Sequence, residues 1–107
     1  MQQQEGIQAF LQQLKEFPEA FVCANDHIAF TVMRLLSNHK ISVPQDLLLT
    51  GYDDQKEYML EQNQVTTVKV RKGLLGKRMV HQLLYRLQNP QADFEEIQIS
   101  PQILDRI

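Results

Sequence analysis

The first part of the chain predicts a helix followed by a buried strand. Five apolar residues before Pro18 recur every three or four positions, which is the spacing of one helix face. They are Ile7, Phe10, Leu11, Leu14 and Phe17. We expect a helix over residues 6–16, which Pro18 ends. The next run, Ala20–Ala24, is continuously apolar and predicts a strand buried on both faces, and Asn25 and Asp26 after it are typical helix N-cap residues.

A second helix is expected over residues 27–37, with its apolar side chains on one arc of the helical wheel. The arc consists of Ile28, Ala29, Val32, Met33, Leu35 and Leu36. Phe30 and Arg34 are expected on the opposite side. An aromatic side chain there indicates a contact surface, or simply a lone exposed Phe, which is common.

The strand–helix pattern then repeats. Leu47–Thr50 predicts a second buried strand, and Gly51-Tyr52-Asp53-Asp54 follows it. Two strands joined through a helix are expected to be parallel. Because the carboxyl ends of parallel strands share one edge of the sheet, where open α/β folds bind ligands, Asn25 and Asp53 are expected close to the same edge.

The second half of the chain predicts further elements of the same kind. Residues 55–64 are polar and indicate a short helix or loop, and Thr66–Val70 is β-branched enough for a third strand. A long helix is expected over residues 72–88, ended by Asn89 and Pro90, and a last strand over residues 96–99. The order of elements predicts an α/β fold, a parallel sheet flanked by helices.

Composition narrows the functional classes. The 107 residues, 43% hydrophobic and 22% charged, fit one globular domain. The net charge of −2 and the scattered lysines and arginines argue against direct nucleic-acid binding. The start of the chain has no secretory signal pattern, and no run approaches the length of a membrane span, so we expect a cytoplasmic protein with no membrane partner.

No catalytic or metal-binding residues are predicted. His27, His39 and His81 have no histidine or cysteine at ligand spacing, and the serines do not occur in a nucleophile elbow. Cys23 lies within an apolar run and is expected to be a buried structural thiol. The glycines match no phosphate-binding or dinucleotide-binding loop, so no cofactor is expected.

The polar residues at the two strand ends are the remaining candidates for chemistry. Carboxylate and amide oxygens accept hydrogen bonds from neighbouring hydroxyls, as a sugar presents them. We expect Asn25 and Asp53 to contact such a ligand, whereas Asp26 and Asp54 cap the segments that follow. Asp53 and Asp54 could instead bind Mg²⁺.

With these residues in place, the chain resembles the lac/gal repressor family of bacterial transcription regulators over residues 18–107. The resemblance includes the segment Pro18–Asp26, Ala29 and Arg34, Val43-Pro44-Gln45-Asp46 and Gly51-Tyr52-Asp53-Asp54. It continues through Thr66-Thr67-Val68, Gly76, Pro101 and Arg106. It implies a partial periplasmic-binding-protein-like (type I) fold, in which two lobes close over a small sugar or sugar phosphate at Asn25 and Asp53.

The resemblance also implies partners and an internal organisation. It places residues 1–107 in the C-terminal part of the effector domain, with 18–66 as the second-lobe core, 67–90 crossing to the first lobe and 91–107 as the return strand and tail. It implies a homodimer, and operator binding only through a helix-turn-helix domain that this segment lacks. The implied dimer surface consists of Phe30, Thr31, Arg34, Glu57, Leu60 and Glu61.

A ligand-sensing and dimerising part of a repressor is therefore the leading prediction. The alternatives are a transport-type sugar-binding module and a Mg²⁺-dependent enzyme using Asp53 and Asp54. One consequence concerns the apolar arc of the helix at 72–88, which the first lobe would bury. We expect repacking within the chain or a second copy of it to cover Leu75, Met79, Val80, Leu83 and Leu87.

Overall fold

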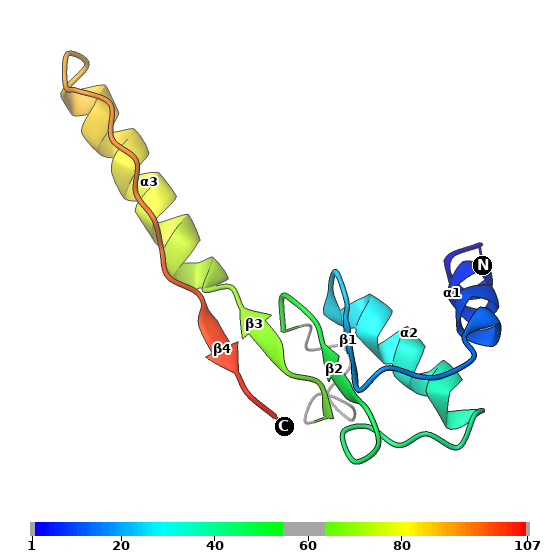
Figure 1. The fold of residues 1–107 in the computed structure, drawn as a ribbon. Coiled ribbons are helices and arrows are strands. Elements are labelled where there is room, and N and C mark those ends of the chain that lie inside the picture. The colour runs from blue at the N-terminus through cyan, green and yellow to red at the C-terminus, as the bar shows by residue number, and fades with distance from the viewer. Residues whose placement is uncertain (1, 55–63, 107) are drawn as a thin grey trace. The chain divides into compact units, whose positions relative to one another are not determined.

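The computed structural model describes residues 2–54 and 64–106 and forms two compact units (Figure 1). The first, here called the core unit, comprises Met1–Lys69 and Ile103–Ile107, and the second, the α3 unit, comprises Val70–Gln102. The elements are α1 (Gln2–Gln13), β1 (Ala20–Val22), α2 (Asp26–Ser37), β2 (Leu48–Thr50), β3 (Thr67–Lys69), α3 (Lys72–Gln88) and β4 (Gln102–Leu104).

The core unit is built on a parallel strand pair, as the sequence predicts. β1 and β2 run parallel, with Phe21 beside Leu49 and Val22 beside Thr50. The chain at Thr66 extends this pairing on the other side of β2: its N–H donates to the Leu49 carbonyl (3.2 Å), and its carbonyl accepts from the Gly51 N–H (2.8 Å). The parallel pairing therefore spans three chain segments: β1, β2 and the chain at Thr66.

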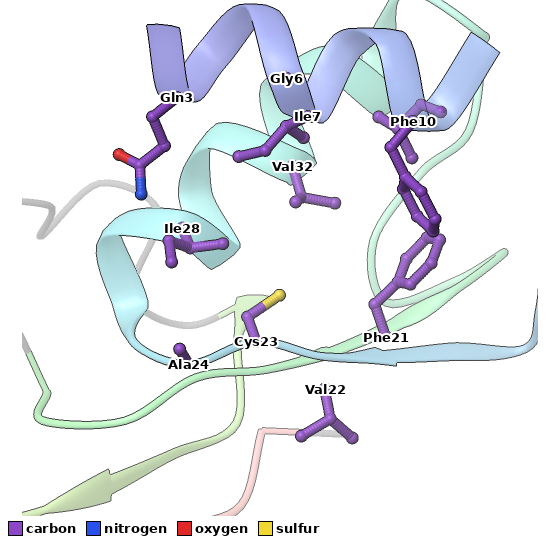
Figure 2. A pocket seen from close by; sticks show the side chains of 11 residues that line it. Gln3, Gly6, Ile7, Phe10, Phe21, Val22, Cys23, Ala24, Ile28 and Val32 are labelled. Atoms are coloured by element: carbon purple, nitrogen blue, oxygen red, sulfur yellow. The ribbon is translucent and has the colours of Figure 1, made fainter. Parts of the chain in front are cut away.

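Helices α1 and α2 pack over β1, and the hydrophobic core lies beneath them (Figure 2). Alternation along β1 decides which side chains join it: Phe21 and Cys23 point towards the helices, and Val22 points away (Figure 2). The buried apolar residues are Leu11, Ala29, Phe30, Val32, Leu35, Leu36, Val43, Leu47, Leu49 and Val65. The fold class expected from the sequence is confirmed.

The expectation that β1 is buried on both faces is wrong. Val22 is 88% exposed, and Ala20 and Ala24 are exposed as well. The helices cover only the face that carries Phe21 and Cys23. An apolar run therefore predicted the strand correctly, but not how many of its faces are covered.

The expectation that Phe30 projects from the outer side of α2 is also wrong. Phe30 is 0% exposed and belongs to the same buried cluster as Val43, Leu47 and Val65. The helical wheel gave the wrong answer because α2 is covered over a wider arc than its most regular apolar positions indicate. The additional members of the cluster come from the segment before β2 and from the strand region after it.

β3 pairs with β4, so the end of the chain returns to the core unit. The last strand was expected over residues 96–99 but is Gln102–Leu104, beyond Pro101. Residues 96–99 run alongside α3 within the α3 unit (Figure 1), where a helix rather than a strand is their neighbour. A strand needs a paired neighbour to satisfy its backbone groups, and β3 provides one only further along.

The α3 helix begins and ends where the sequence predicts, at Lys72 and Gln88. Asn89 ends it, with its backbone N–H (2.9 Å) and its Nδ2 (3.0 Å) both donating to the Tyr85 carbonyl. Arg86 holds the returning segment through hydrogen bonds to the carbonyls of Ala92 (2.6 Å) and Asp93 (2.9 Å) and stacks on the Phe94 ring at 5.0 Å. None of the described residues of α3 is buried.

The first helix covers residues 2–13 instead of the expected 6–16, because the glutamines before Gly6 are good helix formers and nothing interrupts them. Among the helices that the structure describes, none combines the length and apolar character needed to cross a membrane. The assignment of 18–66, 67–90 and 91–107 to lobes stays a prediction.

Candidate functional site

Asn25 caps helix α2 with its side-chain oxygen. The Ile28 N–H donates to Asn25 Oδ1 (2.9 Å), and Asn25 itself has extended backbone, which is the usual N-cap arrangement. This is the side chain's one hydrogen bond within residues 2–54 and 64–106. Its Nδ2 donors therefore remain available to a ligand. The cap falls on Asn25, whereas the sequence favoured Asp26 for that role.

Asp53 and Asp54 both have left-handed backbone, with φ of 97° and 52°. Residues other than glycine rarely adopt this backbone conformation, which costs on the order of 1–3 kcal/mol per residue. Two hydrogen bonds hold the turn: the Asp53 N–H donates to the Val68 carbonyl (2.8 Å), and the Asp54 N–H donates to Thr67 Oγ1 (3.3 Å). Neighbouring β3 thus holds the backbone of Asp53 and Asp54 in this conformation.

The loops that carry Asn25 and Asp53 meet at one edge of the sheet. Both residues lie three positions beyond the register pair Val22–Thr50, and the Asp26 N–H donates to the Tyr52 carbonyl (3.1 Å). We call the two loops, residues 23–26 and 51–54, the rim. The structure places both predicted ligand residues in the rim, while their contact with a ligand stays a prediction.

Arg106 contacts the rim from the end of the chain. Its Nη2 lies 3.5 Å from Asp54 Oδ1, and its Nη1 donates to the Val65 carbonyl (3.2 Å). Its backbone N–H donates to Thr66 Oγ1 (2.9 Å). The side chains of Arg106 and Asp54 are 18% and 9% exposed, so water screens this ion pair only partly.

This ion pair weighs against the Mg²⁺ alternative. A guanidinium beside Asp54 repels a second cation and occupies the carboxylate that Mg²⁺ would need. Within the described residues, no group of three or more histidine, cysteine, aspartate or glutamate side chains could hold a metal ion. A Mg²⁺ site at Asp53 and Asp54 would therefore have to compete with Arg106 for Asp54.

A separate apolar pocket of about 420 Å³ lies between α1, β1 and α2 (Figure 2). Neither Asn25 nor Asp53 lines it. The Cys23 sulfur points into it towards the helices, and burial raises the pKa of that thiol from its ordinary value of 9.0. Phe10 and Phe21 make an edge-on ring contact at 6.3 Å across one side of the pocket. Its walls suit an apolar side chain and not a polyhydroxyl ligand.

The predicted dimer residues divide into three groups. Phe30 is buried in the core, so it is not part of the predicted dimer surface. Thr31 is half-buried, its hydroxyl donating to the His27 carbonyl (3.0 Å), and Arg34 is exposed. Glu57, Leu60 and Glu61 lie outside the described residues.

Sequence reasoning gave no structural role to Thr67 and Arg106. Thr67 is buried, and its hydroxyl donates to Asp26 Oδ1 (2.7 Å). These partners lie 41 residues apart, and Arg106 and Asp54 lie 52 apart. No local pattern indicates such contacts. Their positions in the motifs Thr66-Thr67-Val68 and Pro101…Arg106 were the only signal available.

Comparison with known proteins gives consistent matches. The sequence model of the periplasmic binding protein-like domain matches residues 1–106. The chain is 32% identical over 96 residues to the ribose operon repressor of Haemophilus influenzae, a match that covers 90% of this chain and 29% of that protein. The chain therefore spans less than a third of that relative's length.

Two solved structures share the fold. A LacI family transcriptional regulator from Enterococcus faecium with bound ribose superposes with a TM-score of 0.77 at 26% identity, covering 96% of this chain and 38% of the other. The lac repressor dimer bound to operator and an anti-inducer superposes with a TM-score of 0.81 at 27% identity, covering 98% and 36%.

Proposed function

Because the chain belongs to the periplasmic binding protein-like domain family, as part of the effector domain of a lac/gal-type repressor, we propose that it senses a small sugar at the rim. The observation that carries the proposal is the meeting of the Asn25 and Asp53 loops at the carboxyl ends of two parallel strands. The amide donors of Asn25 and the carboxylate of Asp53 complement the hydroxyls of a pentose or hexose.

The proposed role in regulation is a shift between conformations. A ligand that binds one arrangement of two lobes better than the other biases whatever is attached to them. The lac repressor of known structure is an operator-bound dimer, and this chain aligns with 36% of it. We assign operator contacts to other parts of a whole repressor, because the 107 residues carry a net charge of −2 and no basic stripe.

We also propose a homodimer that uses Thr31 and Arg34 on α2, together with Glu57, Leu60 and Glu61, and a cytoplasmic location. No catalytic role is proposed. The relatives are transcriptional repressors, and Asp54 is engaged with Arg106. A transport-type sugar-binding module would use the same rim, so sugar binding alone does not separate it from a repressor.

Calorimetric titration of the chain with D-ribose and a panel of other pentoses and hexoses tests the proposal. Asn25→Ser retains a cap oxygen but removes the amide donors, and Asp53→Asn removes the charge. We expect each to weaken sugar binding by about tenfold or more, the value of one to two lost hydrogen bonds. The unfolding free energy of Asn25→Ser should stay within about 0.5 kcal/mol of the parent, because serine caps as well as asparagine.

Binding of no sugar in the panel contradicts the proposal. A parallel titration with Mg²⁺ alone distinguishes the acidic-site enzyme, which requires Mg²⁺ binding that Asp53→Asn abolishes.

A further inference from the structure

One buried hydroxyl of β3, that of Thr67, contacts both loops of the rim. Thr67 Oγ1 donates to Asp26 Oδ1 (2.7 Å) in one loop and accepts from the Asp54 N–H (3.3 Å) in the other. Thr67 and Asp26 are each 1% exposed. In a buried site each of these polar groups needs its partner, so removing the hydroxyl disturbs both loops at once.

Arg106 provides a second tie from a different part of the chain. Its guanidinium joins Asp54 to the Val65 carbonyl, and its backbone N–H donates to Thr66 Oγ1. Thr67 and Arg106 therefore both act on Asp54, one through its backbone and the other through its carboxylate. The residue they hold follows Asp53 directly and shares its left-handed backbone.

Both ties lie where the chain passes between the two compact units. The chain leaves the core unit after Lys69, two residues beyond Thr67, and re-enters it at Ile103, three residues before Arg106. These are the two covalent connections between the core unit and the α3 unit. A change in the rim that moves Asp54 therefore alters the contacts of Thr67 and Arg106, which lie close to these connections.

We propose that Thr67 and Arg106 are positioning residues that hold the rim in its sugar-binding conformation and couple it to the two connections at Lys69–Val70 and Gln102–Ile103. The coupling has a use only if the rim binds a ligand, so this inference rests on the proposed function. It adds the path by which an occupied rim biases the segments that leave the core unit. Neither residue is expected to touch the sugar.

The test compares paired variants of the full 107-residue chain. Thr67→Val removes the hydroxyl at nearly constant shape, and Thr67→Ser restores it. Arg106→Met removes the charge, Arg106→Lys retains it, and Arg78→Met is the matched control, since Arg78 is exposed on α3. Amide hydrogen exchange and chemical shifts are recorded by NMR without ligand, and D-ribose affinity is measured by calorimetry.

We expect Thr67→Val and Arg106→Met to speed exchange of the Asp53 and Asp54 amides by about three- to tenfold, the value of one hydrogen bond. Resonances of Val70 and Ile103 should shift, and ribose binding should weaken by a similar factor. Thr67→Ser and Arg106→Lys should restore most of each effect, and Arg78→Met should show none. If Thr67→Val fails to fold, the comparison of Arg106→Met with Arg106→Lys decides whether the inference holds.

Exchange and shifts unchanged in both Thr67→Val and Arg106→Met would overturn the inference, as would undiminished ribose affinity in variants of a chain that binds ribose. Rescue by the conservative variants separates positioning from a general loss of stability. If no sugar binds the unsubstituted chain, the proposed function fails, and the exchange and shift measurements still decide whether the rim is coupled to the connections.

Discussion

Gly51 lies where the loop after β2 approaches the start of α2. Its φ is not in the left-handed region, so a side chain is excluded there by space and not by backbone conformation. A Cβ atom would collide with Asp26 Oδ1 and lie 3.1 Å from the Asp26 Cα. Because Asp26 is buried and bonded to Thr67, it has no room to move away.

We therefore expect Gly51→Ala to lower the unfolding free energy by about 1–3 kcal/mol, as overpacking does in closely packed sites. Gly6→Ala is the control, since nothing lies within 4 Å of its added Cβ and alanine favours helix α1 by about 0.5–1 kcal/mol. Urea unfolding followed by circular dichroism measures both. Equal stability of the two variants would show that Asp26 can yield.

Cys23 makes the stability of the chain depend on pH in the alkaline range. Burial favours the neutral thiol, so the folded chain retains this proton above pH 9.0, where an unfolded thiol has begun to lose it. The stabilising contribution is complete below pH 9.0 and is lost as pH rises through the folded pKa. Unfolding free energies of the parent and Cys23→Ala should therefore converge above pH 9. A difference that stays constant with pH contradicts this.

At the level of the elements, Phe30 shows how far a helical wheel can be trusted. The helical spacing of apolar residues alone predicts the inner arc of α2, and Ala29, Val32 and Leu36 on it are indeed buried. It gives no information on Val43 and Val65, which share the buried cluster with Phe30 but are remote from it in sequence. The wheel thus predicts which face is covered first, and not how far the covering extends.

Phe30→Ala measures this directly. Truncating a fully buried Phe should cost about 3–5 kcal/mol of unfolding free energy, a large share of the stability of a small domain. Arg34→Ala, four residues along on the exposed side, should change it by no more than about 0.5 kcal/mol. Similar small losses in both variants would place Phe30 on the outer face after all.

Strand prediction divides in the same way. Two parallel strands could be predicted from the apolar runs at Ala20–Ala24 and Leu47–Thr50. Short apolar runs on either side of a helix leave few other arrangements. The prediction of a strand over residues 96–99 was wrong, because alternation without a pairing partner does not make a strand. The rim residues Asn25 and Asp53 could be placed from strand ends, whereas Thr67 and Arg106 depend on contacts across most of the chain.

For the whole molecule, the main question is what covers the apolar arc of α3. Met79, Leu83 and Leu87 are 64%, 60% and 69% exposed, so the expectation that the chain covers this arc by repacking is not met in the structure. A continuous apolar face of this kind promotes association. We expect a second copy of the chain to cover it.

We expect the chain to sediment as an oligomer at high micromolar concentration and Met79→Glu/Leu83→Glu to shift it towards the monomer. Arg34→Glu separates this association from the proposed α2 dimer, because it alters only the latter surface. Circular dichroism checks that α3 stays helical. A parent chain that is monomeric at these concentrations, with α3 folded, would exclude association through the arc.

The return of β4 to the core unit has a consequence for biosynthesis. Ribosomes release a chain from its first residue onwards, and most domains fold as soon as their last residue emerges. Here residues 1–69 emerge before the ion pair between Asp54 and Arg106 can form, because Arg106 is synthesised 52 residues after Asp54. Until Arg106 is available, the rim of the nascent polypeptide lacks this ion pair.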